Sequence, residues 1–225
     1  MKPLEVLAEA VLPDGTVMKL TRRGDEYLIL VAGVPLMSSR MHGSEEALAE
    51  LACPHPGALE SPNVLIGGLG MGFTLRAALD LLPLHASVVV AELVPAVVEW
   101  NRGALGPLAG HPLSDERVRV EIGDVAKTLN SAHAQFDAII LDVDNGPADF
   151  TTPRNATLYG AQGLAATHRA LKPGGLFAVW AVKHDPKFQQ RLHAAGFAAQ
   201  IHQVRGHTKN RGPRHIIYLA RKSSG

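Results

Sequence analysis

Short apolar runs rich in β-branched residues alternate with helix-forming stretches from Asn63 onward. Each run has the length and composition of a buried strand, and polar, helix-forming chain separates it from the next. The runs are VLIG from residue 64, SVVVAE from 87, RVRVEIG from 117, FDAIILD from 136 and GLFAVWAV from 175. This alternation predicts a parallel sheet with crossover helices, the arrangement of the α/β class.

Both ends of the chain carry antiparallel patterns instead. Strand-like runs over 198–204 and 215–220 have only a loop between them, which predicts an antiparallel pair at the edge of the sheet. Near the N-terminus, runs over 16–20 and 26–31 flank a polar turn and predict a small β-hairpin.

A short helix should connect this hairpin to the sheet. Ser44 stands at the expected N-cap, acids follow in the first turn, and helix formers continue to Ala52 before two prolines. We therefore expect an N-terminal part over 1–60, made of the hairpin and the linking helix, and a sheet domain over 61–225.

Composition narrows the class of partner. The 225 residues are 46% hydrophobic and carry a net charge of +1, so no global field recruits nucleic acid or anionic lipid, and a small molecule is favoured. Cys53 is the single cysteine, which excludes an internal disulfide and favours a reducing compartment, the cytoplasm. We expect neither an export signal nor a membrane span, because no apolar run has the necessary length.

A glycine-rich turn follows the first strand of the sheet. It reads Gly67-Gly-Leu-Gly-Met-Gly72 and leads into the helix-like stretch FTLRAAL. Glycines there let the backbone approach a ligand while the N–H groups of the helix start point at it, which is typical of a cofactor loop. Tight strand-to-helix turns also use glycine for structural reasons alone.

Two acids at later strand ends strengthen the cofactor reading. Glu92 lies 20 residues beyond Gly72, where a carboxylate can accept both hydroxyl hydrogens of an adenosine ribose. Asp124 closes the third strand, within reach of the adenine amino group. The structural alternatives are a solvated loop acid for Glu92 and a helix N-cap for Asp124, and the N-cap is compatible with ligand binding.

These motifs carry a family resemblance. GGLGMG, AELVPAVVEWN, IGDV, FDAIILDVD and LKPGG together resemble the class I S-adenosylmethionine-dependent methyltransferase fold. GVPLM, SEEALAEL and PNVLIGGLGMGFTLRAAL, with the hairpin, resemble its spermidine synthase (polyamine aminopropyltransferase) branch. The resemblance implies a Rossmann-like sheet of seven strands, mostly parallel with an antiparallel last strand, and a possible homodimer. It implies nucleoside contacts by Gly68, Gly70, Gly72, Glu92 and Asp124, to which we add their neighbours Leu69, Leu93 and Val125.

The chain departs from that family at several positions. Gly70 stands where the family motif GGGDGG has an Asp that pairs with the ammonium of decarboxylated S-adenosylmethionine, and Leu48 and Ala49 replace a Tyr-His pair. An Asp at the loop would also repel the carboxylate of intact S-adenosylmethionine. Its loss leads us to expect the intact cofactor, and a methyltransferase acting on a small amine, hydroxyl or acid.

Candidate catalytic groups follow the fourth strand. Asp142 and Asp144 lie at its tip, where one of them can orient or deprotonate a nucleophile, and Asp142 can also contact the cofactor. The alternative is that both acids cap the turn before Gly146. Tyr159 is a candidate for the acceptor site, although a lone Tyr more often packs its ring. Trp180 and Met71 are candidates for apolar walls around the sulfonium, or for core packing.

Other functions were weighed against this expectation. The runner-up is aminopropyl transfer from decarboxylated S-adenosylmethionine, and a second alternative is a non-catalytic cofactor-binding module. An NAD dehydrogenase would need the last glycine of GxGxxG, which GLGMGF lacks. The eleven histidines show no metal-ligand spacing, so we expect no metal site. A basic cluster over 202–215 lacks interleaved aromatics and is typical of a solvated loop, and no P-loop or nucleophile elbow is present.

Overall fold

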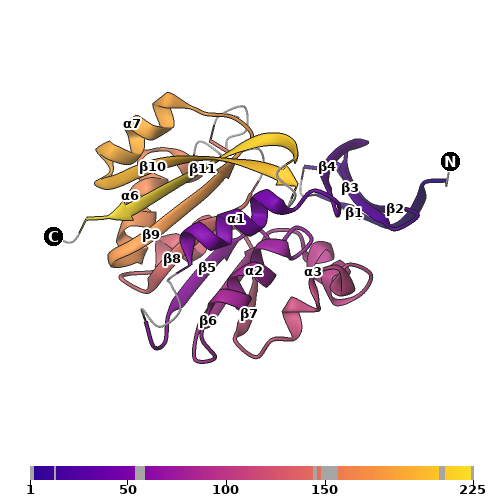
Figure 1. The fold of residues 1–225 in the computed structure, drawn as a ribbon, viewed down its shortest axis with the longest axis horizontal. Coiled ribbons are helices and arrows are strands. Elements are labelled where there is room, and N and C mark those ends of the chain that lie inside the picture. The colour runs from indigo at the N-terminus through magenta and orange to yellow at the C-terminus, as the bar shows by residue number, and fades with distance from the viewer. Residues whose placement is uncertain are drawn as a thin grey trace.

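The computed structural model describes residues 3–12, 14–53, 59–143, 146–147, 157–207 and 211–223. Within these ranges the chain forms two sheets, a small one at the N-terminus and a large one with helices on both faces (Figure 1). The small sheet is antiparallel in the order β1-β2-β3-β4. Its strands are β1 (Glu5–Val11), β2 (Val17–Arg23), β3 (Glu26–Val31) and β4 (Val34–Ser38).

The large sheet contains seven of the described strands, in the order β10-β11-β9-β8-β5-β6-β7. Pairing is parallel from β9 through β8, β5 and β6 to β7, and β11 runs antiparallel to both of its neighbours. The strands are β5 (Asn63–Gly67), β6 (Ser87–Glu92), β7 (Val118–Ile122), β8 (Phe136–Leu141), β9 (Leu171–Ala181), β10 (Phe197–His207) and β11 (Arg211–Lys222).

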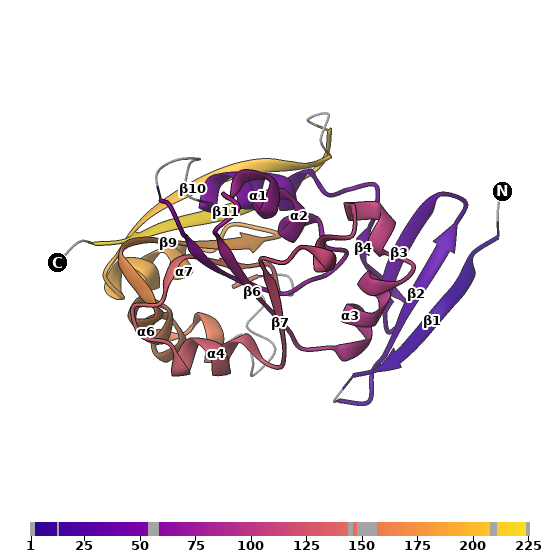
Figure 2. The same ribbon diagram turned by 90° about the horizontal axis from the view of Figure 1, so that it is seen from below.

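Helices form a layer on each face of this sheet, as the turned view shows (Figure 2). One layer contains α1 (Gly43–Ala52), α2 (Phe73–Leu81) and α3 (Pro95–Arg102), with the short 3₁₀ helices η1 (Gly106–Ala109) and η2 (Pro112–Ser114). The other contains α4 (Val125–Ser131), α6 (Ala161–Ala170) and α7 (Pro186–Ala194). None of the helices in the described ranges is both long enough and apolar enough to cross a membrane.

Successive side chains of the central strands point to opposite faces of the sheet, which explains the two helical layers. In β5, Val64 and Ile66 pack with α1, α2 and α3, while Leu65 between them packs with α4 and α6. The same division recurs in β8, where Ile140 and Ile139 face opposite sides. Strands buried on both faces read as continuous apolar runs, which is why the sequence pattern located them.

The predicted fold class is confirmed: a seven-stranded, mostly parallel sheet with an antiparallel last strand, and a small antiparallel sheet before it. The predicted hairpin is β2 and β3, and β1 and β4 extend it on either side. The predicted N-cap was wrong, because α1 begins at Gly43 after His42, and Ser44 Oγ donates instead to Glu45 Oε2 at 2.6 Å. α1 packs across the large sheet, and the proposed boundary at residue 60 stays a prediction.

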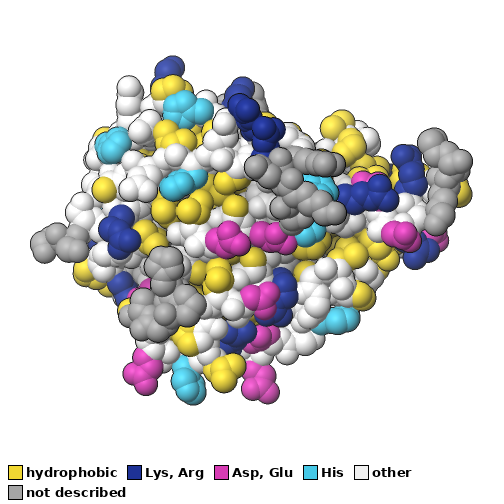
Figure 3. All heavy atoms as spheres, viewed as in Figure 1, with side chains coloured by type: hydrophobic (Ala, Val, Ile, Leu, Met, Phe, Trp, Pro, Cys, Tyr) yellow, Lys and Arg dark blue, Asp and Glu magenta, His cyan; other side chains and the backbone are white. Residues whose placement is uncertain are grey.

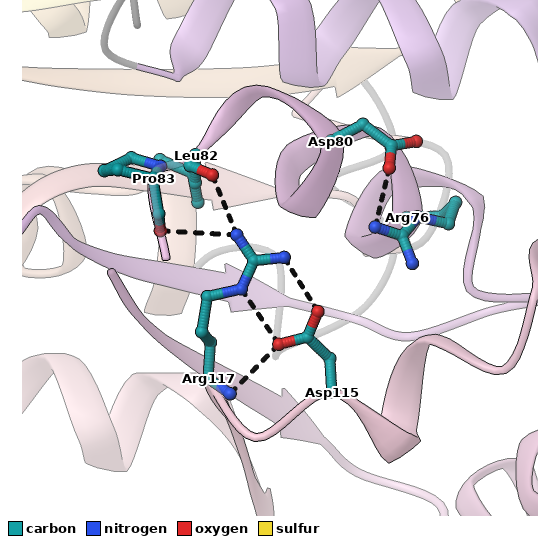
Figure 4. A network of polar contacts seen from close by, with 6 residues as sticks. All are labelled: Arg76, Asp80, Leu82, Pro83, Asp115 and Arg117. Carbon is teal, nitrogen blue, oxygen red and sulfur yellow. Dashed lines mark hydrogen bonds and ion pairs between the residues drawn. The ribbon is translucent and has the colours of Figure 1, made fainter. Parts of the chain in front are cut away.

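One polar network ties the chain before β7 to the chain after α2 (Figure 4). The Arg117 guanidinium donates to both carboxylate oxygens of Asp115, at 2.9 and 2.7 Å, and to the carbonyls of Leu82 and Pro83 at 2.8 and 3.3 Å. The Arg117 hydrogen bonds lower the pKa of Asp115 to about 2. The network fixes the N-terminal ends of β6 and β7. These strands carry the candidate ligand residues Glu92 and Asp124 at their opposite ends.

We expect Arg117→Ala to lower the free energy of unfolding by about 2–4 kcal/mol, because it leaves Asp115 and two carbonyls without their charged donor. Since Asp115 has a depressed pKa when folded, its contribution is present above about pH 4 and is lost as the pH falls toward 2. Urea unfolding from pH 7 to pH 2 should therefore show the wild-type advantage shrinking on the acid side. Arg119→Ala is the control, an exposed arginine two residues along that should cost under about 1 kcal/mol. Equal losses of unfolding free energy in the two variants would contradict the stabilising role given to the Arg117 network.

Candidate functional site

The glycine loop and the predicted acids meet at one edge of the large sheet. Gly67, the last residue of β5, pairs with Ala91 of β6 on one side and Leu141 of β8 on the other. Glu92 at the end of β6 pairs with Ile122 of β7. Parallel strands bring their carboxyl ends to the same edge, the usual ligand edge of such a sheet.

The loop is held in a conformation that requires glycine. Gly68 and Gly70 have φ angles of 89° and 54°, in the left-handed region. A Cβ at Gly68 would collide with the backbone carbonyl oxygen of Asp142. A Cβ at Gly70 would lie 2.9 Å from the methyl carbon of Met37, on β4 of the small sheet. The loop is thus enclosed by the tip of β8 on one side and by the N-terminal sheet on another.

Glu92 braces this loop from the tip of β6. Its Oε2 accepts the N–H of Leu69 and its Oε1 accepts the N–H of Val94, both at 2.8 Å. The side chain is only 7% exposed. Each carboxylate oxygen has a second lone pair, so the same group can also accept ribose hydroxyls. The solvated-loop alternative for Glu92 does not describe this placement.

A second brace was missed by the sequence analysis. Asn101 in α3 is 1% exposed, and its amide donates to the carbonyls of Gly70 and Val97 at 2.8 and 2.9 Å. The asparagine therefore fixes the middle of the loop to the next helix. The sequence offered one signal for it, a polar residue on the apolar face of a predicted helix.

The third predicted acid is Asp124, at the end of β7. Its Oδ1 accepts the N–H of Ala126 at 2.9 Å, so it is the N-cap of α4, and Oδ2 remains for a ligand. Val125 behind it is buried, and Leu93 follows Glu92 with a partly buried side chain. The contacts of these residues with a nucleoside stay a prediction.

Asp142 follows β8 directly and is partly buried beside the first turn of α2. Thr74 Oγ1, in the first turn of α2, donates to its Oδ2 at 2.7 Å. Burial raises the pKa of the Asp142 carboxyl above the ordinary value. The companion residue Asp144 lies outside the described residues, so its predicted role is not placed.

The charge of Asp142 acts on a second carboxyl, which the sequence analysis did not single out. Glu45 is in the first turn of α1 and is 8% exposed. Burial, followed by the charge of Asp142, raises the pKa of Glu45 to about 7. In the sequence, Glu45 and Glu46 are simply two acidic residues in the first turn of a predicted helix. Only the packing of α1 across the sheet shows that Glu45 faces inward.

The remaining candidates are placed in apolar surroundings. Tyr159 is fully buried on the far face of the sheet with its ring edge-on to Phe188, a placement that does not support its predicted acceptor role. Met71 is fully buried in the core of the other face. Trp180, near the end of β9, is partly buried and lies against His215, with ring centroids 4.7 Å apart.

The arrangement fits a nucleoside better than a metal. A glycine cradle, a braced carboxylate at the tip of β6 and an N-cap acid at the tip of β7 offer hydrogen-bond acceptors to ribose hydroxyls and an adenine amino group. Across the part of the chain that the structure describes, no three His, Cys, Asp or Glu side chains gather as metal ligands would.

Comparison with known proteins gives a consistent result. The family model described as the spermine/spermidine synthase domain matches residues 41–197. The polyamine aminopropyltransferase of Mycobacterium tuberculosis is 34% identical over 167 residues, which is 72% of this chain and 30% of that protein. The Bacillus mycoides enzyme of the same name is 30% identical over 197 residues, or 85% of this chain and 60% of that protein. The chain thus spans less than two thirds of the length of these relatives.

Solved structures agree on the fold. A spermidine synthase from Thermotoga maritima matches with a TM-score of 0.74 at 20% identity, covering 98% of this chain and 73% of that one. A spermidine synthase in complex with the transition-state analogue AdoDATO matches with the same values. At this identity the likeness shows the fold alone.

These matches overturn the expected methyltransferase that uses intact S-adenosylmethionine, because the family model and the relatives belong to aminopropyltransferases. The structure supplies a physical reason for the error. Beside Gly70 the end of the Met37 side chain lies 2.9 Å from where a Cβ would stand, so the place of the missing acid is lined by an apolar group rather than by a partner for a carboxylate. A negative charge on Asp142 would in addition repel the carboxylate of the intact molecule.

Proposed function

The chain belongs to the spermine/spermidine synthase domain family, and from that premise we propose that it is an aminopropyltransferase. Its donor would be decarboxylated S-adenosylmethionine and its acceptor a small diamine or polyamine. The observation that carries this proposal is the partly buried Asp142, which accepts a hydrogen bond from Thr74 and lies beside the glycine loop at the tip of β8. An anionic group there suits a donor and an acceptor that are both cationic.

The donor's nucleoside would be held at the tips of β5, β6 and β7. Glu92 would accept hydrogen bonds from the ribose hydroxyls, and Asp124 would accept one from the adenine amino group. The peptide backbone of the loop at Gly68, Gly70 and Gly72 would pack against the nucleoside. Because Glu92 already accepts two backbone N–H groups, it is fixed before the donor arrives. Such preorganisation lowers the entropic cost of binding.

The acceptor amine must lose a proton before it can react. Asp142 would take that proton, the amine lone pair would then form the new N–C bond, and the C–S bond would break with its electron pair moving to sulfur. The donor supplies an activated carbon through its sulfonium, so the protein need only align the amine and accept the proton.

Acceptor contacts must differ in part from those of the resembled family. Leu48 and Ala49, at the places of its Tyr-His pair, are fully buried between α1 and the sheet. They therefore offer no polar group to a diamine. Trp180 and His215 lie against each other on this sheet, and their rings would form an apolar wall for the methylene chain.

The experiment that tests the proposal incubates the purified full chain with putrescine and either decarboxylated or intact S-adenosylmethionine, and measures spermidine and thioether products by chromatography. We expect spermidine with the decarboxylated donor and no transfer with the intact one. Absence of product with diamines and polyamines, while calorimetry shows that the donor binds, would favour the non-catalytic binding module instead.

Donor binding is tested in the same preparation by Glu92→Gln. The amide loses one acceptor oxygen, and with it the brace on Leu69 or Val94 and a ribose contact, so we expect donor affinity to fall by about 100-fold. Glu99→Gln is the matched control, an exposed glutamate on α3 paired with Arg102, and should leave affinity unchanged. Equal affinity of the two variants would remove Glu92 from the donor site.

A further inference from the structure

Thr74 is a buried threonine in the first turn of α2, directly after the glycine loop. Its side chain is withdrawn from solvent, with the residue 3% exposed, and its Oγ1 donates to Asp142 Oδ2 at 2.7 Å. The two residues are 68 positions apart in the chain. This hydrogen bond therefore links the helix that begins at the glycine loop to the tip of β8, where the proposed base stands.

The direction of the Thr74 hydroxyl differs from that of a threonine elsewhere in the fold. A threonine within a helix can donate to the carbonyl four residues before it. Thr167 in α6 does this, with its Oγ1 donating to the Gly163 carbonyl at 2.9 Å. For Thr74 the corresponding carbonyl is that of Gly70, which belongs to the glycine loop and accepts an amide N–H of Asn101 at 2.8 Å. The Thr74 hydroxyl instead leaves its own helix and bonds to the proposed base.

The charged side chains of α2 lie on another side of the helix. Arg76 and Asp80 pair at 2.6 Å there, and both line a cavity of about 340 Å³ between α1 and α2. Acidic side chains are visible over these two helices in the space-filling view (Figure 3). Residues two apart on a helix do not share a face, and Thr74 is not part of the cavity lining. Its hydroxyl therefore serves Asp142 and not this acidic surface.

Asp142 is held through both its main chain and its side chain. Its N–H donates to the Gly67 carbonyl at 2.9 Å, which fixes the main chain against the end of β5. In the part of the chain that the structure describes, Thr74 is the one hydrogen-bond donor to its carboxyl group. The hydroxyl occupies Oδ2, so Oδ1 is the oxygen left for an incoming amine.

A hydroxyl donor suits a carboxyl that must change its protonation state. An ionised carboxylate accepts at both oxygens, and once Oδ1 has taken a proton, Oδ2 can still accept. The hydrogen bond from Thr74 can thus persist through proton transfer, without reorientation of the carboxyl group. Without this bond the group can turn, because the last torsion of an aspartate side chain has broad minima.

We propose that Thr74 is a positioning residue for the transfer reaction, whose hydroxyl holds Asp142 Oδ2 so that Oδ1 faces the acceptor amine and takes its proton. The inference rests on the proposed function. In the step, an N–H bond of the acceptor ammonium breaks and the proton passes to Oδ1. The freed lone pair forms the N–C bond as the C–S bond breaks, with its electron pair moving to sulfur. Thr74 keeps its own proton and acts only through the orientation of Asp142.

The first experiment compares Thr74→Val with Thr74→Ser in assays with the decarboxylated donor and a diamine. Valine has nearly the shape of threonine without the hydroxyl, and serine keeps the hydroxyl without the methyl group. In Thr74→Val we expect kcat to fall about 10- to 100-fold, the effect of a misplaced reacting group, with donor affinity unchanged. Thr74→Ser should retain most of the wild-type kcat. Equal losses of kcat in the two variants, or a loss of donor affinity as large as that of kcat, would overturn the inference.

Thr167→Val is the matched control. Thr167 is also buried in a helix, but its hydroxyl bonds within α6, on the opposite face of the sheet. Whatever the effect of this change in urea unfolding, kcat and donor affinity should stay at their wild-type values. A loss of kcat as large as that of Thr74→Val would show that removal of any buried hydroxyl slows the reaction, and would overturn the inference.

A double-mutant cycle tests whether Thr74 acts through Asp142. If the hydroxyl only orients the base, Thr74→Val should cause no further loss of kcat in the Asp142→Asn background, where no base is present. Single-turnover assays with enzyme in excess and radiolabelled donor measure these slow rates. Losses that multiply in the double variant would show that Thr74 acts independently of Asp142, and would overturn the inference.

These outcomes are distinct from failure of the proposed function. A wild-type protein that transfers no aminopropyl group would overturn the proposed function and this inference with it. Transfer by the wild type, with an unchanged kcat in Thr74→Val, would overturn the inference alone. If urea unfolding shows that Thr74→Val does not fold, Thr74→Ala replaces it and should show the same fall in kcat, whereas a wild-type kcat would contradict the proposal.

Discussion

Asp142→Asn is expected to lower kcat for aminopropyl transfer by about 10²- to 10⁴-fold, the usual contribution of a positioned general base. Thr74 Oγ1 can still donate to the amide oxygen, so the local geometry should persist. The amide cannot take the amine's proton, and the loss should therefore fall on kcat, with little change in donor affinity. Stopped assays with the decarboxylated donor and a diamine measure this effect.

The same variant should become more stable above pH 7. The carboxyls of Asp142 and Glu45 both have raised pKa values when folded, so their ionisation opposes folding, and the Glu45 contribution makes stability fall as the pH rises from about 4.5 through about 7. Removing one charge relieves this penalty, by about 1–3 kcal/mol at pH 8. Asp80→Asn, an exposed carboxyl on α2, is the control and should change neither rate nor stability appreciably. A stable but fully active Asp142→Asn protein would exclude Asp142 as the base.

Gly68→Ala is expected to abolish donor binding and to lower the free energy of unfolding by about 2–5 kcal/mol. Two costs combine: an L-residue at a φ of 89°, and a Cβ that collides with the Asp142 carbonyl oxygen. Relief of the collision must separate the glycine loop from the tip of β8, which breaks the hydrogen bond from Asp142 N–H to the Gly67 carbonyl. Calorimetry with the donor and urea unfolding measure the two losses.

The control for Gly68 shares its backbone conformation but not its crowding. Gly33, between β3 and β4, has a φ of 79°, and a Cβ there would meet nothing within 4 Å. Gly33→Ala should therefore cost only the conformational term, about 1–2 kcal/mol, and leave donor affinity unchanged. If both alanines cost the same, the contact between the loop and Asp142 would not be the reason that glycine is needed at 68.

Local patterns predicted the frame of this molecule. Buried strands such as VLIG and FDAIIL are apolar on both faces, so they stand out without any knowledge of their partners. Glu92 and Asp124 were found because each follows a strand, and parallel strands end at a common edge. The N-cap bond of Asp124 was foreseen for the same local reason.

The missed residues depend on contacts between distant segments. Glu45 and Asp142 are 97 positions apart in the chain, and the charge of Asp142 acts on Glu45 only because α1 packs against β8. Asn101 reaches Gly70 from another helix. Tyr159 shows the opposite difficulty, because nothing local distinguishes a tyrosine that enters a site from one that fills a core, and the structure places its ring in the core. The mistaken preference for intact S-adenosylmethionine came from considering the absence of an acid at position 70 without the Met37 side chain that lies beside it.

Met37, the neighbour of Gly70, gives the small N-terminal sheet a direct contact with the glycine loop. Met37 reaches from β4 into the space that a side chain at Gly70 would need, with a separation of 2.9 Å to a Cβ there. An aspartate introduced at 70 alone would meet both this methionine and an unfavourable backbone angle. The methionine methyl is the far end of a flexible side chain and can move aside, so the backbone angle at 70 is the greater obstacle to an aspartate there. The small N-terminal sheet thereby supplies the glycine loop with an apolar wall that can yield rather than a rigid one.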